Sequence, residues 1–576
     1  MLAEGKEIFM DSVADPIEII PVYEALARDL KAMGVDTVFG LMSDDTAHFG
    51  VSIDSMGIKF LGTRHENIAI AMADSYAAAT GRLAVGLVGR GPALANGLHG
   101  AAFASRTGNP LLLIYGEAPS GVSHNGLGPD YKAFDQVGVL RAAGIRTFTP
   151  TSPNDARQTM ADAAAAARTG ATVALLLPVN IQLAEISISG YLPEGIDGSP
   201  IKLPAPQPAR PHAVSAAAAL LSTAKRPLIL AGYGAHKAGA REVLIKLAEK
   251  TGALLATTAK GKDLFRKHPL NIGIIGSFSH SLARRMAGNA DCVVAVGAGL
   301  NVLTMSFGES LPNAPLIQID ARRANIGRWM TADVSVVGDA KLTVEQLIAA
   351  LPDKTLAEKP FHSPDNMKIL NGFRIETDFE PANTARTVDP RSLAVRLSEL
   401  LPEKRNITYD AGNFLGVVPY LETPGPAHFK MTNDFASIGL GFGAALGFAR
   451  ARPDETTVLV IGDGGFLMTM GELETVVRED LPIVIVLMND CAYGAELHFL
   501  RLRQLPVQKS IFPDVDFAPI AEALGYEAHT IRSLDQLEAL APLLSNPEGP
   551  IFLDCKINAD VAAPFMSEIA AADARR

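Results

Sequence analysis

The sequence predicts an α/β protein with three doubly wound domains, each built on a parallel sheet. Short apolar runs rich in β-branched residues alternate with helical patterns along the chain, and glycine-rich turns follow several of these runs. Proline-rich segments without periodicity interrupt the alternation at about residues 186–212 and 352–386. A chain of 576 residues is also too long for one core. We therefore expect domains at residues 1–190, 191–360 and 361–576.

The first domain is predicted from an alternation of helix and strand between residue 17 and about residue 185. Its helices are expected over 17–33, after the segment 63–67, and after Pro92. Its strands are short apolar segments at residues 37–40, 58–62, 83–88, 110–115 and 172–177.

The second domain, from about residue 213 to 350, has the same rhythm. Its expected strands are residues 227–231, 253–257, 292–296 and 316–320. The loop that contains Gly232, Gly234 and Gly239 fits either a nucleotide cradle or an ordinary tight turn. The third domain begins near Val388, and the polar, alanine-rich residues 558–576 that end the chain are expected to be either a frayed end or a lid.

One stretch of the third domain carries the strongest chemical signal. An apolar strand at 457–461 precedes the glycine turn Gly462-Asp463-Gly464-Gly465-Phe466, and a second strand follows at 483–487. Between them we expect one helix, with apolar residues at helical spacing, which ends at Asp480-Leu481-Pro482. A glycine turn before a helix presents backbone N–H groups and a positive helix end, so it favours an anion.

Two aspartates are expected close to this glycine turn. Asp463 is in the turn and Asp490 follows the next strand, so adjacent parallel strands would bring both to one edge of the sheet. A carboxylate beside a phosphate is repulsive unless a divalent cation bridges them. The stretch therefore predicts Mg²⁺ that ties a diphosphate to the protein. The alternatives are a plain turn capped by aspartate, or a dinucleotide site, which would require glycine where Leu467 stands.

Composition excludes several other classes of function. The net charge of −11 and the lack of a basic cluster argue against nucleic acid and anionic membranes as partners. Cys292, Cys491 and Cys555 lie too far apart for a disulfide framework or a metal-ligand pattern, which fits a reducing compartment. The first 16 residues contain no apolar signal core, and no apolar run approaches the ~20 residues of a membrane span. We expect a soluble, cytoplasmic protein.

Five motifs in order resemble those of thiamin-diphosphate-dependent enzymes, in the branch with acetolactate synthase, pyruvate decarboxylase and benzoylformate decarboxylase. They are Arg64-His65-Glu66-Asn67 with Tyr76-Ala77 and Thr80-Gly81; Gly89-x-Gly91-Pro92-x-x-x-Asn96; Asp410-Ala411-Gly412-Asn413-Phe414; Ala436-Ser437-Ile438-Gly439; and Gly462-Asp463-Gly464 with Asn489-Asp490. The resemblance covers nearly the whole chain. It implies a pyrimidine-binding domain, a central Rossmann-like domain and a diphosphate-binding domain, in that order.

The resemblance assigns the catalytic carboxyl group to Glu66. The thiazolium C2–H of the cofactor is a weak acid, so the cofactor's own amino group must act as the base, and a carboxyl group must protonate ring nitrogen N1′. Glu66 begins an apolar helix, where desolvation would raise the pKa of its carboxyl group. The alternative is a solvated glutamate that only stabilises the helix start.

The resemblance also implies the residues that hold the cofactor. Ile438 would bend it, the carbonyl of Ala436 would accept from its amino group, and Asp463, Asp490 and the carbonyl of Ala492 would bind the cation. Asp490 stands where asparagine is usual, and Asn489 could contribute instead if the register slips by one. The remaining contacts are expected from Gly412, Asn413, Phe414, Gly462, Gly464, Gly465, Tyr493 and Gly494. In this family the cofactor lies between two subunits, which implies a homodimer at minimum and commonly a homotetramer.

Four further residues are expected at the substrate end. Asp44 and Glu496 stand where decarboxylases carry acids, and Asp135 and Gln136 follow Phe134 where acetolactate synthases have a phenylalanine–glutamine pair. Acids here would suit the protonation of a carbanion. The alternatives are that Asp44 is a turn residue and Glu496 a residue of a helix surface.

The resulting hypothesis is a non-oxidative carbon–carbon lyase or carboligase. It would act on a 2-oxo acid or α-hydroxyketone, by decarboxylation, acyloin formation or both, through an enamine intermediate. The alternative is an acetolactate-synthase-like acetyl transferase. An FAD-containing oxidase or an NAD oxidoreductase is less favoured, because the strand end Val296 to Asn301 lacks the arginine expected to contact a flavin. A cofactor-binding relative without catalysis is disfavoured by the presence of Glu66, Asp463 and Ile438.

Overall fold

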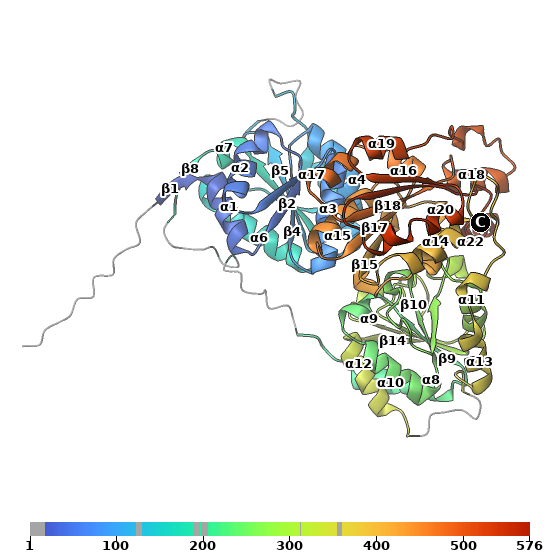
Figure 1. Ribbon diagram of the computed structural model, residues 1–576. Coiled ribbons are helices and arrows are strands. Elements are labelled where there is room, and N and C mark those ends of the chain that lie inside the picture. The colour runs from blue at the N-terminus through green and yellow to red at the C-terminus, as the bar shows by residue number, and fades with distance from the viewer. Residues whose placement is uncertain are drawn as a thin grey trace, which may run out of the picture. The chain divides into compact units, whose positions relative to one another are not determined.

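The computed structural model describes residues 18–122, 130–188, 193, 196, 205–311, 313–353 and 360–575. These residues form three six-stranded sheets, parallel throughout, and a separate two-stranded sheet (Figure 1). The predicted fold class, three doubly wound α/β domains, is confirmed. The N-terminal sheet forms one compact unit, and the central and C-terminal sheets together form a second. The boundaries proposed between the domains stay predictions.

The N-terminal sheet has the strand order β3-β2-β4-β5-β7-β6. Its central strands β5 and β7 are buried along their whole length, which explains their continuous apolar runs. The strands are β2 (Thr37–Gly40), β3 (Lys59–Gly62), β4 (Ala84–Val88), β5 (Leu111–Glu117), β6 (Arg146–Phe148) and β7 (Thr172–Pro178). The helices are α1 (Val22–Ala32), α2 (Ala47–Ser55), α3 (Glu66–Thr80), α4 (Pro92–Thr107), α5 (Gln136–Ala142), α6 (Ala156–Arg168) and α7 (Val179–Gln182).

The structure corrects the prediction at the start of this unit. The helix expected over 17–33 begins only at Val22. The residues before it form β1 (Glu18–Pro21), which pairs antiparallel with β8 (Glu185–Ile188), a partner distant in sequence. Helix α2 was not predicted, because the chain between the expected strands 37–40 and 58–62 was interpreted only as a turn.

The central sheet has the order β11-β10-β9-β12-β13-β14. The four predicted strands are present, and β11 and β14 are two edge strands that were not predicted. The strands are β9 (Pro227–Ala231), β10 (Leu254–Thr257), β11 (Asn271–Ile274), β12 (Cys292–Val296), β13 (Leu316–Asp320) and β14 (Val334–Val337). The helices are α8 (Pro211–Thr223), α9 (Tyr233–Lys237), α10 (Arg241–Thr251), α11 (Ser281–Ala287), α12 (Ala340–Ala350) and α13 (Pro364–Gly372).

The C-terminal sheet has the order β16-β15-β17-β18-β20-β19. Its strands are β15 (Arg405–Tyr409), β16 (Phe429–Met431), β17 (Thr456–Gly462), β18 (Ile483–Asn489), β19 (Glu527–Ile531) and β20 (Ile551–Lys556). Its helices are α14 (Pro390–Leu400), α15 (Gly441–Ala451), α16 (Asp463–Leu467), α17 (Glu472–Arg478), α18 (Gly494–Leu502), α19 (Ala518–Ala523), α20 (Leu534–Glu538), α21 (Ala541–Ser545) and α22 (Pro564–Ala574).

The single helix predicted after the glycine turn is two short helices, α16 and α17. Leu467, which was counted on the apolar face of that helix, ends α16 and is about half exposed. The apolar spacing therefore runs across a break, and only part of it faces the core.

All three sheets change direction at one point in their strand order. The chain moves outward to one side from β2, β9 and β15, and to the other side from β4, β12 and β17. Ligands of open α/β sheets bind at such switch points, outside the carboxyl ends of the strands. The turn 41–45 and the loop 89–91 follow β2 and β4, and residues 410–414 and 462–465 follow β15 and β17. Three of the five motifs, together with the turn that carries Asp44, therefore lie at or next to the switch points of their sheets.

The segment predicted as a linker, 352–386, and the C-terminal tail, 558–576, each contain a helix in the part that the structure describes. Helix α13 lies inside the stretch predicted as a linker, and Met367 and Leu370 pack against the core of the central sheet. The tail forms α22, with Phe565 and Met566 buried in the core of the C-terminal sheet. Part of the proline-rich stretch 186–212 lies outside the described residues.

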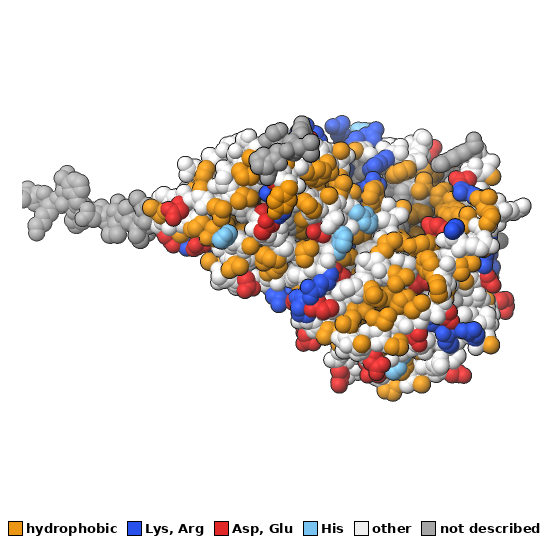
Figure 2. Space-filling view, turned by 90° about the horizontal axis from the view of Figure 1, so that it is seen from above, with side chains coloured by type: hydrophobic (Ala, Val, Ile, Leu, Met, Phe, Trp, Pro, Cys, Tyr) orange, Lys and Arg blue, Asp and Glu red, His pale blue; other side chains and the backbone are white. Residues whose placement is uncertain are grey.

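One face of the surface can be seen in a space-filling view. Figure 2 shows acidic and basic side chains mixed over the face that it displays, with hydrophobic side chains between them. Within the described residues, none of the helices combines the length and the apolar character that a membrane span requires.

The contacts that hold α22 in place lead to a prediction about stability. Buried Glu568 accepts hydrogen bonds from Arg284 Nη1 and Ser277 Oγ, both at 2.6 Å. Glu568→Gln removes the charge that these donors face, and we expect it to cost about 1–3 kcal/mol. Amide hydrogen exchange of residues 564–574 should accelerate.

The matched control is Glu309→Gln, which removes an exposed partner of Arg575 and should cost no more than about 1 kcal/mol. Unchanged exchange across α22 in Glu568→Gln would contradict the role given to this buried pair.

Candidate active site

The centre of the candidate site is a pair of carboxylates at the carboxyl edge of the C-terminal sheet. Strands β17 and β18 pair in parallel with Gly462 opposite Met488, so Asp463 and Asp490 leave the sheet side by side. Their side chains interact directly. Burial raises the pKa of both carboxyl groups, and the neighbouring charge of Asp490 raises the pKa of Asp463 further. Two like charges held together in this way are a ready binding site for a cation.

Three glycines let the chain close tightly around this pair. A Cβ at Gly464 would lie 2.6 Å from Cε1 of Tyr493, and one at Gly494 would lie 2.3 Å from Oδ2 of Asp490. A Cβ at Gly465 would lie 2.3 Å from Oδ2 of Asp410. Any larger residue would push these groups apart. The glycines that the sequence marked are therefore required for packing, and they bring the turn 462–465 against residues 490–494.

The side chain of Asn489 points away from the pair. Its Nδ2 donates to Asp554 Oδ1 at 2.9 Å, and its Oδ1 accepts from Cys491 N at 3.3 Å. Asp490 Oδ1 accepts from Ala492 N at 3.2 Å, while Cys491 between them adopts a left-handed backbone with φ of 56°. This register presents Asp490 beside Asp463, and it leaves Asn489 committed to the neighbouring strand β20.

Asp410 joins the other predicted cofactor segments to this centre. It is fully buried and accepts from Gly439 N at 2.7 Å, from Gly441 N at 3.1 Å and from the Thr432 hydroxyl at 3.1 Å. The segment that contains Ala436 and Ile438 is thereby fixed next to Gly465. Ala436 is exposed with φ of 52°, and Ile438 is half-buried.

The segment after β15 links the site to the tail. Phe414 packs beside Gly462, since a Cβ at that glycine would lie 3.0 Å from the Phe414 ring. Gly412 is packed in the same way, because its Cβ would lie 2.6 Å from that ring. Asn413 Nδ2 donates to Val561 O at 2.9 Å, and Asn413 Oδ1 accepts from Ala563 N at 2.8 Å. The amide of Asn413 is therefore committed to the residues that lead into α22.

Glu66 is the first residue of α3 in the N-terminal unit. Its exposed fraction is 7%, and it lies on a helix whose following residues are buried, as the apolar sequence predicted. Asn96 Nδ2, on the next helix of the chain, donates to Glu66 Oε2 at 3.3 Å. The backbone N–H of Asn67 is capped by Nδ1 of His65 at 3.2 Å, so Glu66 is not used as the cap. Its carboxyl group is thus buried, singly hydrogen-bonded and close to the helix start.

The residues predicted for the substrate end differ in their surroundings. Gln136 is buried, donates to Gly116 O and Glu117 Oε2 at 2.9 Å, and accepts from Gly91 N at 2.9 Å, so it ties the start of α5 to the end of β5 and to the loop 89–91. Asp135 is exposed and caps α5 by accepting from Gly138 N at 2.8 Å. Asp44 is exposed and pairs with Lys132, whose hydrogen bond lowers the pKa of the Asp44 carboxyl group.

Glu496 lies in the first turn of α18 in the second unit and is exposed. Within the N-terminal unit, the structure places Asp44 and Gln136 at the same edge of the sheet, since Lys132 and Gly91 belong to loops there. Glu66 begins the helix that follows β3.

The sequence analysis missed a buried charge cluster in the N-terminal unit. Asp45 is buried and accepts from Arg90 N at 3.0 Å, while Arg90 Nη1 donates to both carboxylate oxygens of Asp130 at 2.8 and 2.6 Å. Two members of this cluster could have been recognised in the sequence, because Asp45 directly follows Asp44 and Arg90 lies inside the motif 89–96. This cluster orders the loops that carry Asp44 and Gly91.

The arrangement suits Mg²⁺ held together with a diphosphate. Across the residues that the structure describes, no group of three or more His, Cys, Asp and Glu side chains forms a metal-binding cluster. Two carboxylates and a backbone carbonyl leave coordination positions for phosphate oxygens, which is how Mg²⁺ is commonly bound beside phosphates.

Comparison with protein families gives three matches, which together cover most of the chain. Residues 20–139 match the N-terminal TPP binding domain of thiamine pyrophosphate enzymes, residues 214–347 their central domain, and residues 410–555 their C-terminal TPP binding domain.

Curated relatives align over nearly the full length. The probable acetolactate synthase large subunit of Methanocaldococcus jannaschii is 30% identical, with 94% of this chain and 93% of the relative covered. The sulfoacetaldehyde acetyltransferase of Alcaligenes xylosoxydans xylosoxydans is 29% identical, with 90% and 89% covered. The probable 2-ketoarginine decarboxylase of Pseudomonas aeruginosa is 28% identical, with 91% of each chain covered.

A solved structure shares the fold. The X-ray structure of a protein from Mycobacterium smegmatis, described as a thiamin diphosphate-dependent enzyme, superposes with a TM-score of 0.75 at 23% identity. It covers 94% of this chain and 99% of its own.

The raised pKa values of Asp463 and Asp490 make a prediction for the metal-free protein. Each carboxyl group holds its proton more tightly in the folded than in the unfolded state. Its stabilising effect is therefore full at low pH and is lost as the pH rises. Between about pH 5 and about pH 8, the wild type should lose about 1–3 kcal/mol more unfolding free energy than Asp490→Asn, which lacks one of the two like charges.

Denaturant unfolding of both proteins across this range, with metal chelated, measures the difference. Addition of Mg²⁺ at the upper pH should restore stability to the wild type. Parallel pH profiles in the two proteins would show that the two carboxylates do not repel each other.

Proposed function

The chain belongs to the thiamine pyrophosphate enzyme family and is a thiamin-diphosphate-dependent carboligase or decarboxylase, and we propose that its substrate is a 2-oxo acid or an α-hydroxyketone. The family predicted from the five motifs is confirmed. When bound, the cofactor supplies a carbon nucleophile and an electron sink for carbon–carbon bond cleavage or formation. The observation that carries the proposal is the buried Asp463–Asp490 pair beside a glycine turn at the switch point of the sheet.

These residues fit the diphosphate end of the cofactor. Asp463 and Asp490, with the carbonyl of Ala492, would hold Mg²⁺, and the turn that contains Gly462, Gly464 and Gly465 would present backbone N–H groups to a diphosphate, while Gly494 lets its loop pack against Asp490. Phe414 and Tyr493 pack against Gly462 and Gly464, respectively. Gly412 and Asn413 order the adjoining loop. Ile438 and the carbonyl of Ala436 would fix the bend of the cofactor.

Glu66 fits the other end of the cofactor. Its carboxyl group would hold the proton that it shares with ring nitrogen N1′. Two observations support this role: the Glu66 side chain is buried at the start of α3, and the hydrogen bond from Asn96 orients its carboxyl group. Glu66 and Asp463 lie in different compact units of the chain.

We propose that the protein is at least a homodimer, and a homotetramer in its complete form. Leu467 and Met468 are large apolar residues that are about half exposed, and the backbone of Gly439 lies near Met468, so an apolar surface adjoins the cofactor segments. A second copy would cover it. All three cysteines are free, which supports a cytoplasmic location.

At the substrate end we propose general acid roles for Asp44 and Glu496, and positioning roles for Asp135 and Gln136. The ion pair with Lys132 orients Asp44 and lowers the pKa of its carboxyl group, so Asp44 could donate a proton only after this ion pair opens. Gln136 orders Gly91 and Glu117, and Asp135 fixes the start of the helix that carries it. In this proposal, an acid beside the reacting carbon would supply the proton that a substrate carbanion needs.

Acetyl transfer, as expected of an acetolactate-synthase-like enzyme, is the second candidate. The buried Gln136 after Phe134 favours it, since this is the pair expected of acetolactate synthases. A flavin is disfavoured in the central sheet. Gly232 N and Gly234 N, which could face a phosphate there, donate instead to Val296 O at 2.9 Å and Gly297 O at 3.0 Å.

A panel of 2-oxo acids and α-hydroxyketones tests the proposal. Purified protein with thiamin diphosphate and Mg²⁺ should release CO₂ or aldehyde, or form an acyloin, from at least one compound. Glu66→Gln should lower kcat by a factor of at least about 10² while the cofactor still binds, because the lost group is a general acid.

Asn96→Asp is a useful comparison variant, because it keeps the shape of the side chain beside Glu66 but removes the amide donor. Complete inactivity of the wild type across the panel, or full activity of Glu66→Gln, would overturn the proposal.

A further inference from the structure

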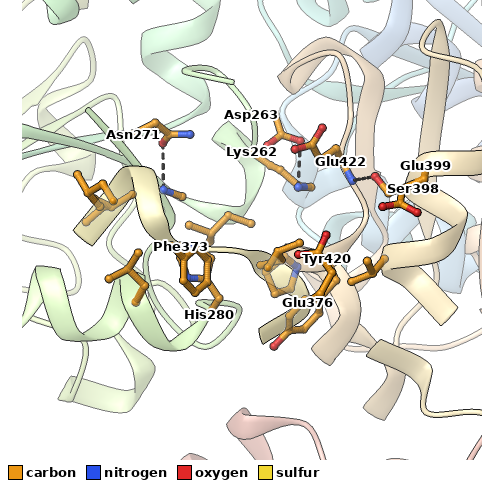
Figure 3. Close-up of a pocket in the computed structure, with 18 residues that line it drawn as sticks. Lys262, Asp263, Asn271, His280, Phe373, Glu376, Ser398, Glu399, Tyr420 and Glu422 are labelled. Atoms are coloured by element: carbon orange, nitrogen blue, oxygen red, sulfur yellow. Dashed lines mark hydrogen bonds and ion pairs between the residues drawn. The ribbon is translucent and has the colours of Figure 1, made fainter. Parts of the chain in front are cut away.

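A cavity of about 360 Å³ lies in the second unit, where the central sheet domain meets the C-terminal sheet domain (Figure 3). One wall comes from β11 and α11, the opposite wall from α14 and the 3₁₀ segment η7 (Asn413–Tyr420), and the connecting segment 370–376 completes it. None of its lining residues is among those assigned above to the cofactor, the cation or the substrate. Its volume is in the range of pockets for small molecules.

The walls of this cavity are held in place by direct contacts. Asp378 Oδ1 accepts from Ser281 N at 2.9 Å on one side, and Asp378 Oδ2 accepts from the Tyr420 hydroxyl at 2.7 Å on the other. The rings of His280 and Phe373 stack with centroids 4.8 Å apart. The cavity is therefore preformed, and a ligand would not have to order its walls.

Hydrogen-bond donors gather on the side of the central domain. The side chain of Lys262 is only 3% exposed, and its Nζ lies 2.9 Å from Asp263 Oδ2, which also accepts from Thr423 N at 2.7 Å. Asn271 Oδ1 accepts from Gly273 N at 3.0 Å, so Nδ2 remains as the donor, and Figure 3 shows it pointing into the cavity.

His280 adds a neutral donor to the same side. Burial lowers its pKa to about 4, so the ring is uncharged at neutral pH. Its Nδ1 accepts from Ala283 N at 3.2 Å, which places the ring proton on Nε2. Gly273 leaves room for this nitrogen, since a Cβ there would lie 2.9 Å from it.

Carboxylates gather on the other side. Glu399 and Glu422 line the wall from the C-terminal domain, opposite Asn271 in Figure 3, and they pair with Arg396 and Arg266, respectively. Glu376, on the connecting segment, is exposed and has no ion-pair partner among the described residues. The cavity therefore offers a negative group that can accept a cation without breaking an existing pair.

Apart from Asp263, which pairs with Lys262, the acids lie on the other two walls. Apolar side chains line much of the remaining surface, and they include Ile272, Ile274, Leu282, Leu370, Phe373 and Val395. A purely apolar ligand would leave the donors of Lys262 and Asn271 desolvated and unsatisfied. An amine without a carboxylate would also leave these donors unsatisfied. A carboxylate without an amine would leave Glu376 without a cationic partner.

We propose that this cavity binds an amino acid with an apolar carbon skeleton. Its carboxylate would accept from Lys262, Asn271 and His280, its ammonium group would face Glu376, and its carbon skeleton would contact Phe373 and Leu282. This site is separate in its residues from the proposed catalytic function and does not depend on it.

Calorimetric titration of the full chain, loaded with Mg²⁺ and thiamin diphosphate, tests the proposal. Three matched sets are compared: leucine with isoamylamine and isocaproate, phenylalanine with phenethylamine and hydrocinnamate, and ε-aminocaproate with hexylamine and caproate. In at least one set the zwitterion should bind at least about tenfold more tightly than either singly charged analogue. The sets distinguish an α-amino acid from one whose charges are farther apart.

Two variants locate the binding. Asn271→Asp keeps the acceptor for Gly273 N but replaces the Nδ2 donor, and Glu376→Gln removes the unpaired charge; each should weaken the zwitterion at least about tenfold. Glu380→Gln, an exposed glutamate outside the cavity, is the control and should leave binding unchanged. The proposal is overturned if no zwitterion binds, if a singly charged analogue binds as tightly in every set, or if both cavity variants bind like the control.

Discussion

The repulsion between two neighbouring carboxylates, Asp463 and Asp490, is the constraint on which the rest of the candidate site depends. Parallel pairing of β17 and β18 delivers both side chains to one edge, and three glycines allow the surrounding loops to close over them. Buried like charges are costly unless a cation or a proton neutralises them. The fold therefore builds a site that favours a positive partner, and we propose Mg²⁺ together with a diphosphate for this role.

The same sheet topology is used in three different ways along this chain. At the C-terminal switch point glycines let the surrounding loops pack against two acids, and at the N-terminal one a charge cluster around Arg90 orders the loops near Asp44. At the central switch point the glycine loop is closed, because its N–H groups bond to the end of β12. Instead, the central domain contributes one wall of the cavity that Lys262 lines. This wall lies at the β11 edge of its sheet, and β14 forms the other edge.

Much of this could be predicted from the sequence, because buried parallel strands are continuous apolar runs and the family motifs sit at strand ends. The failures have a common physical cause. Strand β1 depends on β8, a partner that local periodicity cannot reveal, and α16 and α17 share an apolar spacing that a break interrupts. Helix α22 is held by Arg284 and Ser277, far away in sequence. The roles of Asp45, Arg90 and the cavity likewise arise only when distant segments meet.

We propose that Glu66 of one subunit and Asp463 of its partner act on one cofactor. The most direct test is co-expression of Glu66→Gln and Asp463→Asn chains with different tags, followed by purification of the mixed oligomer. Each variant alone should be nearly inactive, whereas the mixed oligomer should regain about half of the wild-type activity, because one of its two equivalent sites would carry both native residues. A mixed oligomer no more active than its parents would contradict the claim.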